Sequence, residues 1–293
     1  MRSGAGLETV LHQLSRVFLR DTFAAIAAIT LIVFAILLAS GGDWRRYFTR
    51  NYRTDWLYTI FYASGFYVAF VLRPLVSRLD HFVDIYTPAV RLHVAAVLPY
   101  PLQLVVGLLA MDFCAYWGHR FQHANRWLWI FHSIHHSQEK VTTVTNFRLH
   151  FVDMTYRNCV TFFPAMIVGL PAHDWLPFRI AMMWIEQASH GEVGWTYGWL
   201  GRIFVSPNYH FVHHSRLPEQ EHRNYSMILT IWDILFGTAN WNSSRQSPTG
   251  VGDWQIPESF LVQTWYPFVI LWRQLRALRP SAVRSPTAYK PPA

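Results

Sequence analysis

The stretch Phe131-His132-Ser133-Ile134-His135-His136 spells a histidine triplet, His-x-x-His-His, in the middle of the chain. On a helix each residue advances by about 100°, so the three histidines fall within an arc of roughly 100° and share one face. Neutral imidazole is the commonest metal ligand among protein side chains. The stretch therefore predicts a helix that presents three nitrogen ligands in one direction.

Two other segments repeat this pattern. The triplet returns at His210-Phe211-Val212-His213-His214, and His119 and His123 stand one helical turn apart before the first triplet. Histidine runs also occur as tags or on ordinary surfaces, but these histidines are interleaved with Trp, Phe and Ile in mid-chain. The three segments hold eight imidazoles, which predicts a site for two metal ions.

Composition indicates an integral membrane protein. Of the 293 residues, 52% are hydrophobic and only 14% are charged, whereas soluble domains carry about 25% charged residues. The formal net charge is +8, but the arginines flank apolar runs as interface anchors do, so we expect no nucleic-acid partner. The two cysteines, Cys114 and Cys159, form no Cys-x-x-Cys pair, which excludes iron–sulfur clusters and thiolate zinc sites on ligand count.

The apolar runs predict an all-α, integral membrane helical protein with about four spans, some of which could be hairpins. We expect four regions, namely an amphipathic segment at 1–21, transmembrane helices at 22–117, a histidine-rich region with further membrane helices at 118–240, and an interfacial segment and tail at 241–293. The arginine-rich loop 43–55 predicts the cytoplasmic side of the membrane.

Five apolar runs could enter the bilayer, at residues 22–40, 56–72, 89–117, 162–170 and 175–188. We expect Arg73-Pro74 to stop the second run. Pro99-Tyr100-Pro101 breaks the third, which could be one kinked helix or two half-spans. The fourth and fifth runs are short and predict a broken span or a helical hairpin. Residues 260–272 are aromatic-rich and too short for a span, so we expect an interfacial helix there.

In order along the chain, the words His119-Arg120-Phe121-Gln122-His123, His132-Ser133-Ile134-His135-His136-Ser137 and His210-Phe211-Val212-His213-His214 resemble the sterol desaturase and fatty acid hydroxylase superfamily. Further matching words are Asp112 to Trp117, Pro207-Asn208, Asn224-Tyr225 and Trp232 to Thr238. The resemblance covers about residues 112–238. It implies a membrane-embedded, non-haem di-iron oxygenase whose cytosolic helical cap holds the histidine-rich dimetal site.

The resemblance also implies a ligand set. His190 in Ser189-His190-Gly191 is similar to a family ligand, although Gly191 and Glu192 depart from the family pattern, and His150 in Arg148-Leu149-His150 is a further candidate. The expected metal ligands are His119, His123, His132, His135, His136, His150, His190, His210, His213 and His214. We expect no catalytic residues separate from these ligands. The implied cofactors are two iron ions with O2 as co-substrate, since zinc would bind such nitrogen ligands equally well but has no redox chemistry.

Two carboxylates are expected to support ligating imidazoles by accepting their second N–H. Asp112 lies seven residues before His119 and Glu186 lies four residues before His190, so each pair shares a helix face. The alternative is that both carboxylates cap helices or pair with arginines.

Two classes of function remain open. The first is an O2-dependent lipid hydroxylase or desaturase that acts on an unactivated C–H bond. The second is a membrane metal-binding or transport protein with a histidine relay. The first two apolar runs contain no histidine, which favours the enzyme, because transport predicts ionisable residues along the spans. A zinc hydrolase would need only three ligands.

As partners of the enzyme we expect a lipid substrate in the bilayer (sterol, fatty acyl, ether or amino lipid) and a separate electron donor (ferredoxin, cytochrome or reductase). We expect a multi-pass protein with the metal site on the cytoplasmic face of a bacterial inner membrane or the endoplasmic reticulum. The segments Leu102 to Trp117 and Trp175 to Ala188, with Ala181 and Met182 in the upper part, are the expected walls of an apolar passage to the metals.

Overall fold

The computed structural model describes residues 44–48, 50–86, 98–168, 172–242, 247–252 and 256–277, together with positions 24, 27, 28, 30–36, 38 and 39. Among these residues there is no strand, and only two isolated bridges occur, Phe204 with Leu229 and Ser215 with Thr249. The all-α prediction is confirmed for this part of the chain. The longer helices are α2 (Arg50–Ala63), α3 (Arg73–Tyr86), α4 (Tyr100–Ala124), α5 (Arg126–His136), α6 (Phe151–Val168), α7 (Ala172–Ser189) and α10 (Phe260–Ala277).

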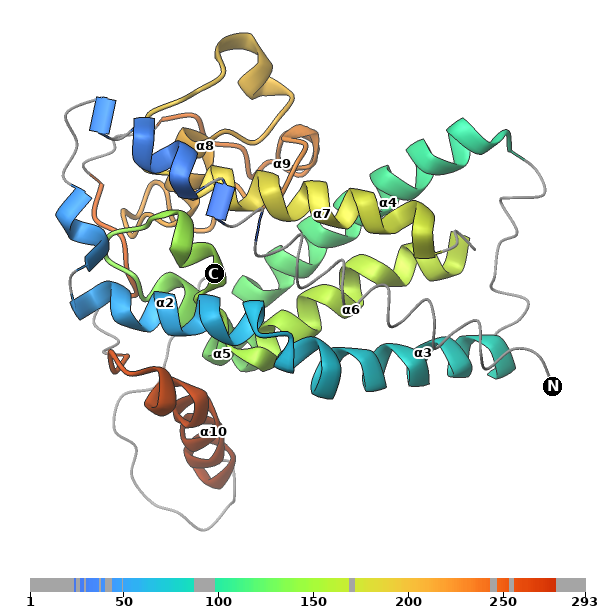
Figure 1. The fold of residues 1–293 in the computed structure, drawn as a ribbon, viewed down its shortest axis with the longest axis horizontal. Coiled ribbons are helices and arrows are strands. Elements are labelled where there is room, and N and C mark those ends of the chain that lie inside the picture. Colours follow the sequence, from blue (N-terminus) through green and yellow to red (C-terminus); the bar gives the residue numbers. More distant parts are fainter. Residues whose placement is uncertain are drawn as a thin grey trace.

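The remaining helical pieces are short. They are η1 (Trp44–Phe48), η2 (Val68–Leu72), η4 (Thr143–Phe147), η5 (Gly198–Arg202), α8 (Pro207–His213) and α9 (Ile231–Leu235). Figure 1 shows the long helices α4, α6 and α7 side by side, with α8, α9 and their connecting loops gathered at one end of them. α10 projects from this assembly and contacts it through α5 and α2.

The count of about four spans is not confirmed by the described helices. α4 alone is long and apolar enough to cross a membrane by itself, with a window of mean hydropathy 1.3. The helices Tyr52–Ala63 and Val68–Leu79 meet the same requirement only together, and they are bent by 54° at their break. The described part of the chain therefore holds one helix of spanning character, or two if the bent pair is one span. The predicted segment 1–21 and the part 89–97 of the third run lie outside the described residues, whereas the described positions of the run 22–40 are helical.

The break in the second apolar run lies earlier than predicted. α2 ends at Ala63, and Gly65 follows with φ of 75°, a left-handed conformation that glycine adopts without steric cost. The prediction that Arg73-Pro74 stops the helix is wrong, because α3 begins at Arg73 and continues to Tyr86. Pro74 is the second residue of α3 and follows the π-helical turn η2, a position that tolerates the missing N–H.

The other predicted helices exist with longer bounds. α4 runs unbroken through His119 to Ala124, and α5 nearly coincides with the helix predicted for the first triplet. α6, α7 and α10 each have 18 residues and so extend beyond the predicted runs 162–170, 175–188 and 260–272. Tertiary packing stabilises these additional turns, whose polar residues hide them from a search for apolar runs.

Close packing of α6 on α4 holds the turn of α4 that carries the first histidine. A Cβ on Gly118 would lie 2.8 Å from Cγ1 of Val160, so only glycine permits this approach. The Tyr156 hydroxyl donates to the Gly118 carbonyl at 3.3 Å. Because His119 follows Gly118 directly, α6 holds His119 at a defined depth in the molecule.

A buried ionic network fixes the end of α5. The side chain of Arg148 is fully buried, and it donates from Nη1 to Asp55 of α2 at 2.8 Å and from Nη2 to Glu258 beside α10 at 2.7 Å. Its Nε donates to the Ile134 carbonyl and the Ser137 hydroxyl. Breaking one partner of such a network leaves an uncompensated buried charge. The network therefore ties α2, α5 and the start of α10 together around the central triplet.

Candidate metal centre

Asn125 sets the angle between the two helices that carry the first five histidines. It is the C-cap of α4 and the N-cap of α5, and its side-chain oxygen accepts the N–H groups of Trp127 and Leu128 at 2.9 and 3.2 Å. An asparagine in this role satisfies donors that the first helical turn leaves free. α4 therefore ends one residue after His123, and α5 turns back across it.

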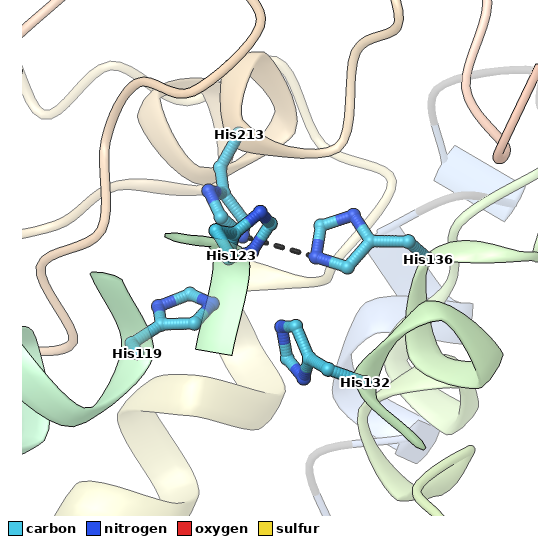
Figure 2. A group of neighbouring side chains, drawn as sticks. All are labelled: His119, His123, His132, His136 and His213. Atoms are coloured by element: carbon cyan, nitrogen blue, oxygen red, sulfur yellow. Dashed lines mark hydrogen bonds between the residues drawn. The ribbon is translucent and has the colours of Figure 1, made fainter. Parts of the chain in front are cut away.

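Five buried histidines from three helices form what we call the first histidine group. Figure 2 shows them converging from α4, α5 and α8. Their facing nitrogens lie within 4.8 Å of one another, and the members are His119, His123, His132, His136 and His213. Nε2 of His213 and Nε2 of His136 are 3.2 Å apart.

Four further buried histidines form the second histidine group. Its members are His135, His190, His210 and His214, again with one nitrogen each within 4.8 Å of the others. Their Nε2 atoms face one another. Nε2 of His190 lies 3.2 Å from that of His135, 3.1 Å from that of His210 and 3.2 Å from that of His214.

Each triplet contributes to both groups. The triplet on α5 gives His132 and His136 to the first group and His135 to the second, while α8 gives His213 to the first and the other two to the second. All nine side chains lie on only four segments, so the groups are neighbours. The ring centroids of His136 and His214, one from each group, are 4.6 Å apart.

Backbone carbonyls hold several of these rings in one tautomer. Nδ1–H of His119 donates to the Tyr225 carbonyl and that of His213 to the Arg223 carbonyl, both at 2.9 Å. Nδ1–H of His190 donates to the carbonyl of Glu186 at 2.7 Å. Because a carbonyl only accepts, Nδ1 carries the proton in these rings, and the Nε2 lone pair is left facing the group.

Asn224 places two of these carbonyls. It has φ of 58°, a left-handed conformation that asparagine tolerates better than most residues. Its side-chain amide donates to the carbonyls of Tyr209 and Asn240 at 2.9 and 2.7 Å. Since Arg223 and Tyr225 flank it, the turn at Asn224 aims one carbonyl at α8 and the other at α4.

The carboxylate that supports an imidazole is Asp153, which the sequence analysis did not identify. Its Oδ2 accepts Nδ1–H of His132 at 3.0 Å, and its Oδ1 accepts from the Gln122 amide. A carboxylate in this position fixes the ring and raises its basicity toward a metal. Asp153 lies on α6, a different helix from His132, so a search for carboxylates on the histidines' own helices passes over it.

Burial keeps these rings neutral, which is the form that binds metals. Desolvation lowers the pKa of His190 to about 4 and that of His213 to about 3, although in each ring the hydrogen bond to a backbone carbonyl partly opposes this shift. Desolvation first, and neighbouring histidines second, hold the pKa values of other members well below 6.5, namely those of His135, His136, His210 and His214. The lone pairs are therefore available at neutral pH.

The residues fit a pair of metal ions. Nitrogen ligands at about 2.0–2.1 Å from a tetrahedral ion are separated by about 3.3 Å, close to the spacing of 3.1–3.2 Å within the second group. Nε2 of His123 and Nε2 of His132 are buried without a hydrogen-bond partner among the described residues. The ligand nitrogens of their group lie within 4.8 Å of one another, and their lone pairs repel unless a cation or proton lies between them. The donor set contains no thiolate, which suits iron, copper, nickel or zinc.

The structure brings nine of the ten expected ligands together and leaves out His150. Both ring nitrogens of His150 meet the backbone, since Nε2 lies 3.0 Å from the Thr264 carbonyl and Nδ1 accepts the N–H of Val152 at 3.1 Å. His150 thus caps the start of α6. His222, in a polar loop, also lies outside both groups, with its ring centroid 6.4 Å from that of His123.

The two carboxylates expected to support ligands have other partners. Asp112 accepts the N–H groups of Ile228 and Leu229 and the indole N–H of Trp232, and therefore holds the segment before α9. The carboxylate of Glu186 pairs with arginines, and only its backbone carbonyl reaches His190. The alternative of arginine pairing describes Glu186 correctly.

Comparison with known proteins agrees with the histidine pattern. Residues 104–238 match the model of the fatty acid hydroxylase family. The chain is 33% identical over 171 residues to an ornithine lipid hydroxylase of Rhizobium tropici, which is 58% of this chain and 51% of that protein. Over 133 residues it is 32% identical to human alkylglycerol monooxygenase, 44% of this chain and 29% of that protein. No solved structure matches the chain.

A more distant relative is methylsterol monooxygenase 1-3 of Arabidopsis thaliana, which is 28% identical over 138 residues, 46% of this chain and 47% of that protein. Over residues 104–238 these matches confirm the resemblance to the sterol desaturase and fatty acid hydroxylase superfamily that the histidine words predicted. All nine clustered histidines lie within the matched residues 104–238. The chain spans about half the length of the bacterial and plant relatives and less than a third of the human one.

Proposed function

We propose that this protein is a membrane-bound oxidoreductase that uses two iron ions, O2 and electrons from a separate donor to hydroxylate or desaturate an unactivated C–H bond of a lipid. The observation that carries the proposal is the convergence of nine buried imidazoles in two adjoining groups. The relatives support a lipid substrate, since their names specify ornithine lipid, alkylglycerol and methylsterol. Two bound iron ions would supply the redox chemistry that activates O2 toward a C–H bond.

The chain's own residues would hold the two metal ions, orient the ligating rings and shield the site from bulk water. The members of the two groups would bind one ion each, with Nε2 as the ligand atom wherever Nδ1–H donates to a carbonyl or carboxylate. Asp153 and the carbonyls beside Asn224 would keep the rings of the first group in the binding orientation. Complete burial of the groups would exclude bulk water, so that O2 and substrate meet in a dry site.

An apolar pocket near the end of α7 supports a lipid substrate. It has a volume of about 530 Å³ and lies between the last turns of α7 and the segment around η5. Its lining is predominantly apolar, from Trp184, Ile185, Ala188, Tyr197, Leu200, Phe204 and Val205. Ala188 is two residues before His190, and Val205 directly precedes the Ser206 cap of α8. The pocket therefore adjoins both segments that carry the second group.

This pocket differs from the passage expected from the sequence. Ala181 is exposed and Met182 is buried in the hydrophobic core, so neither lines it. None of the pocket's lining residues comes from Leu102 to Trp117. Only the end of Trp175 to Ala188 takes part, on the side of α7 that faces η5.

The proposal includes insertion in the membrane with the histidine groups on its cytoplasmic side. α4 is of spanning length, and it exposes large apolar side chains at Val105, Leu109 and Phe113. α10 likewise exposes Leu261 and Trp265, as an interfacial helix would. Arg45 of η1 and Arg53 of α2 are exposed, and positive side chains at this position support a cytoplasmic side.

A metal transporter is the less favoured function. A relay would spread ligands along the spans, whereas α4 carries its two histidines in its last two turns and the other seven lie on α5, α7–α8 and the loop between them. The nine imidazoles form closed groups at one end of the long helices and do not extend along them.

Comparative lipid mass spectrometry tests the proposal. Cells that express the chain should contain lipids that gain one oxygen atom or lose two hydrogens, and cells with the double variant H136A/H214A should not. An unchanged lipid profile in cells whose protein carries two iron ions would contradict the proposal.

Two variants of one helix test the pocket. Ala188→Trp should reduce product by at least about tenfold because a large side chain fills the pocket, while metal content stays unchanged. Ala181→Trp is the matched control, since this residue of α7 is exposed, and it should keep full activity. Equal loss in both variants would remove the pocket from the proposal.

A further inference from the structure

Two arginines share one carboxylate between α6 and α7. Arg157 of α6 donates from Nη2 to Oε2 of Glu186 at 3.1 Å, and Nη1 of Arg179 of α7 lies 3.9 Å from Oε1 of the same group. The side chains of Arg157, Arg179 and Glu186 are only 15%, 10% and 8% exposed. Within the part of the chain that the structure describes, the trio therefore carries one positive charge more than its carboxylate balances, in a largely buried position.

Arg179 is the arginine whose bonding is incomplete. Its Nε and Nη1 are buried and have no hydrogen-bond partner among the described residues, and its contact with Glu186 is too long for a hydrogen bond. Leaving buried charged donors unsatisfied is costly. The pairing of Glu186 is already met by Arg157 at 3.1 Å, so the fold does not require a second arginine at this carboxylate.

The surplus charge lies on the face of α7 that leads to the second histidine group. Arg179, Glu186 and His190 are spaced by seven and four residues, which places them along one helix face. The Glu186 carbonyl accepts Nδ1–H of His190 at 2.7 Å. Between Arg179 and His190 the helix rises by about 16 Å, from 1.5 Å per residue.

We propose that Arg179, with Arg157 beside it, binds the anionic oxygen group of the lipid substrate, a carboxylate or a phosphate. The planar guanidinium matches either group through two parallel N–H donors, and binding would satisfy the donors that the free protein leaves unpaired. The inference rests on the proposed function only in taking the ligand to be the lipid that is oxidised. Trp184 and Ala188 of the apolar pocket lie on the opposite face of α7, so the pocket itself is not the site of the anionic group.

Binding measurements on the detergent-purified, iron-loaded chain test the subsite without turnover. The probes are laurate and dodecyl phosphate, with dodecanol as the uncharged molecule of the same chain length and inorganic phosphate as the anion without a chain. We expect one of the two charged amphiphiles to bind at least about tenfold more tightly than dodecanol, as a charged hydrogen bond predicts. The tighter of the two identifies the carboxylate or the phosphate as the recognised group.

Two arginine variants show whether the preference for a charged amphiphile depends on Arg179. Arg179→Gln should abolish the preference for the charged amphiphile, and Arg276→Gln, at an exposed arginine of α10, should keep it. Inorganic phosphate that competes as strongly as dodecyl phosphate would overturn the lipid assignment. An absent preference in the native chain, or one that Arg179→Gln retains, would overturn the subsite. Binding without any oxidised lipid product would contradict the proposed reaction and leave the subsite standing.

The melting temperature without ligand distinguishes a ligand-binding role of Arg179 from a structural one. Arg179→Met should keep or raise the melting temperature, because it removes unsatisfied buried donors and leaves Glu186 paired with Arg157. Arg157→Met should lower it, because the shorter ion pair is lost. Equal losses in both variants would make Arg179 a structural partner of Glu186 and contradict the proposal.

Discussion

The two histidine groups differ in how their rings are held. In the first group, three of the five imidazoles donate Nδ1–H to an acceptor, namely the Tyr225 carbonyl, the Arg223 carbonyl or Asp153. In the second group, only His190 has such an acceptor among the described residues. Nδ1 of His135 and Nδ1 of His214 are buried without a partner.

This difference predicts unequal metal sites. Acceptors behind a ligating imidazole typically change metal affinity by 10–100-fold. We therefore expect the first group to hold its ion more tightly and the second to exchange its ion more readily. Ala188 and Val205 of the apolar pocket lie close in the sequence to His190 and His210 of the second group, so the less constrained site would be the one nearer the substrate.

The largest expected effect comes from two adjacent residues, the last residue of α8 and the C-cap that follows it. His213→Ala should remove the ion of the first group and His214→Ala the ion of the second, leaving about one ion per chain in each case and reducing activity to background. The double variant should lose both ions. Elemental analysis measures the stoichiometry, with the exposed His81→Ala of α3 as the control that keeps two ions. Full metal content in either single variant would contradict the division into two groups.

Removing the carboxylate of Asp153 that supports His132 should affect the first group only. Asp153→Asn weakens the acceptor behind His132, so the affinity of the first group for its ion should fall by about 10–100-fold. Glu186→Gln is the control, because the second group uses its carbonyl and not its carboxylate. Metal competition titrations measure both affinities, and a loss in the Glu186 variant equal to that in the Asp153 variant would remove the distinction.

The turn at Asn224 offers a graded test of the first group. Asn224→Gly keeps the left-handed backbone but loses the bonds to Tyr209 and Asn240, and it should lower the free energy of unfolding by about 1–3 kcal/mol. Asn224→Ala should cost about 1 kcal/mol more, because alanine disfavours this backbone conformation. Both variants should weaken metal binding in the first group and spare the second. Weakening of both groups to the same extent would show that the turn serves the whole site.

The smallest effect is expected at His150. His150→Ala should keep two ions per chain and lower the free energy of unfolding by about 1–2 kcal/mol, through the lost cap of α6 and the lost contact with the Thr264 carbonyl. Denaturant titration and elemental analysis measure the two quantities. Loss of an ion would place His150 among the ligands and contradict the assignment of ligands to the two histidine groups.

Several features of this site could be predicted from spacing alone. His119 with His123, and each triplet, share a helix face because the helical repeat is a local property, and α4, α5 and α8 carry them as expected. Neither the acceptors nor the apolar pocket could be predicted in this way. Asp153 lies 21 residues from His132, and Tyr225 lies 106 residues from His119, so only packing brings them together.

Local periodicity and composition were sufficient for the helical class, for eight of the nine clustered histidines and, with the family words, for His190. Tertiary structure alone decided that one face of α5 serves two groups and that His150 caps a helix. It also decided that the carboxylate of Asp112 binds the segment before α9 and that of Glu186 pairs with arginines. The physical reason is that a helix repeat fixes which side chains point the same way. Which residues those side chains contact depends on how closely separate helices approach each other, as α6 approaches α4 at Gly118.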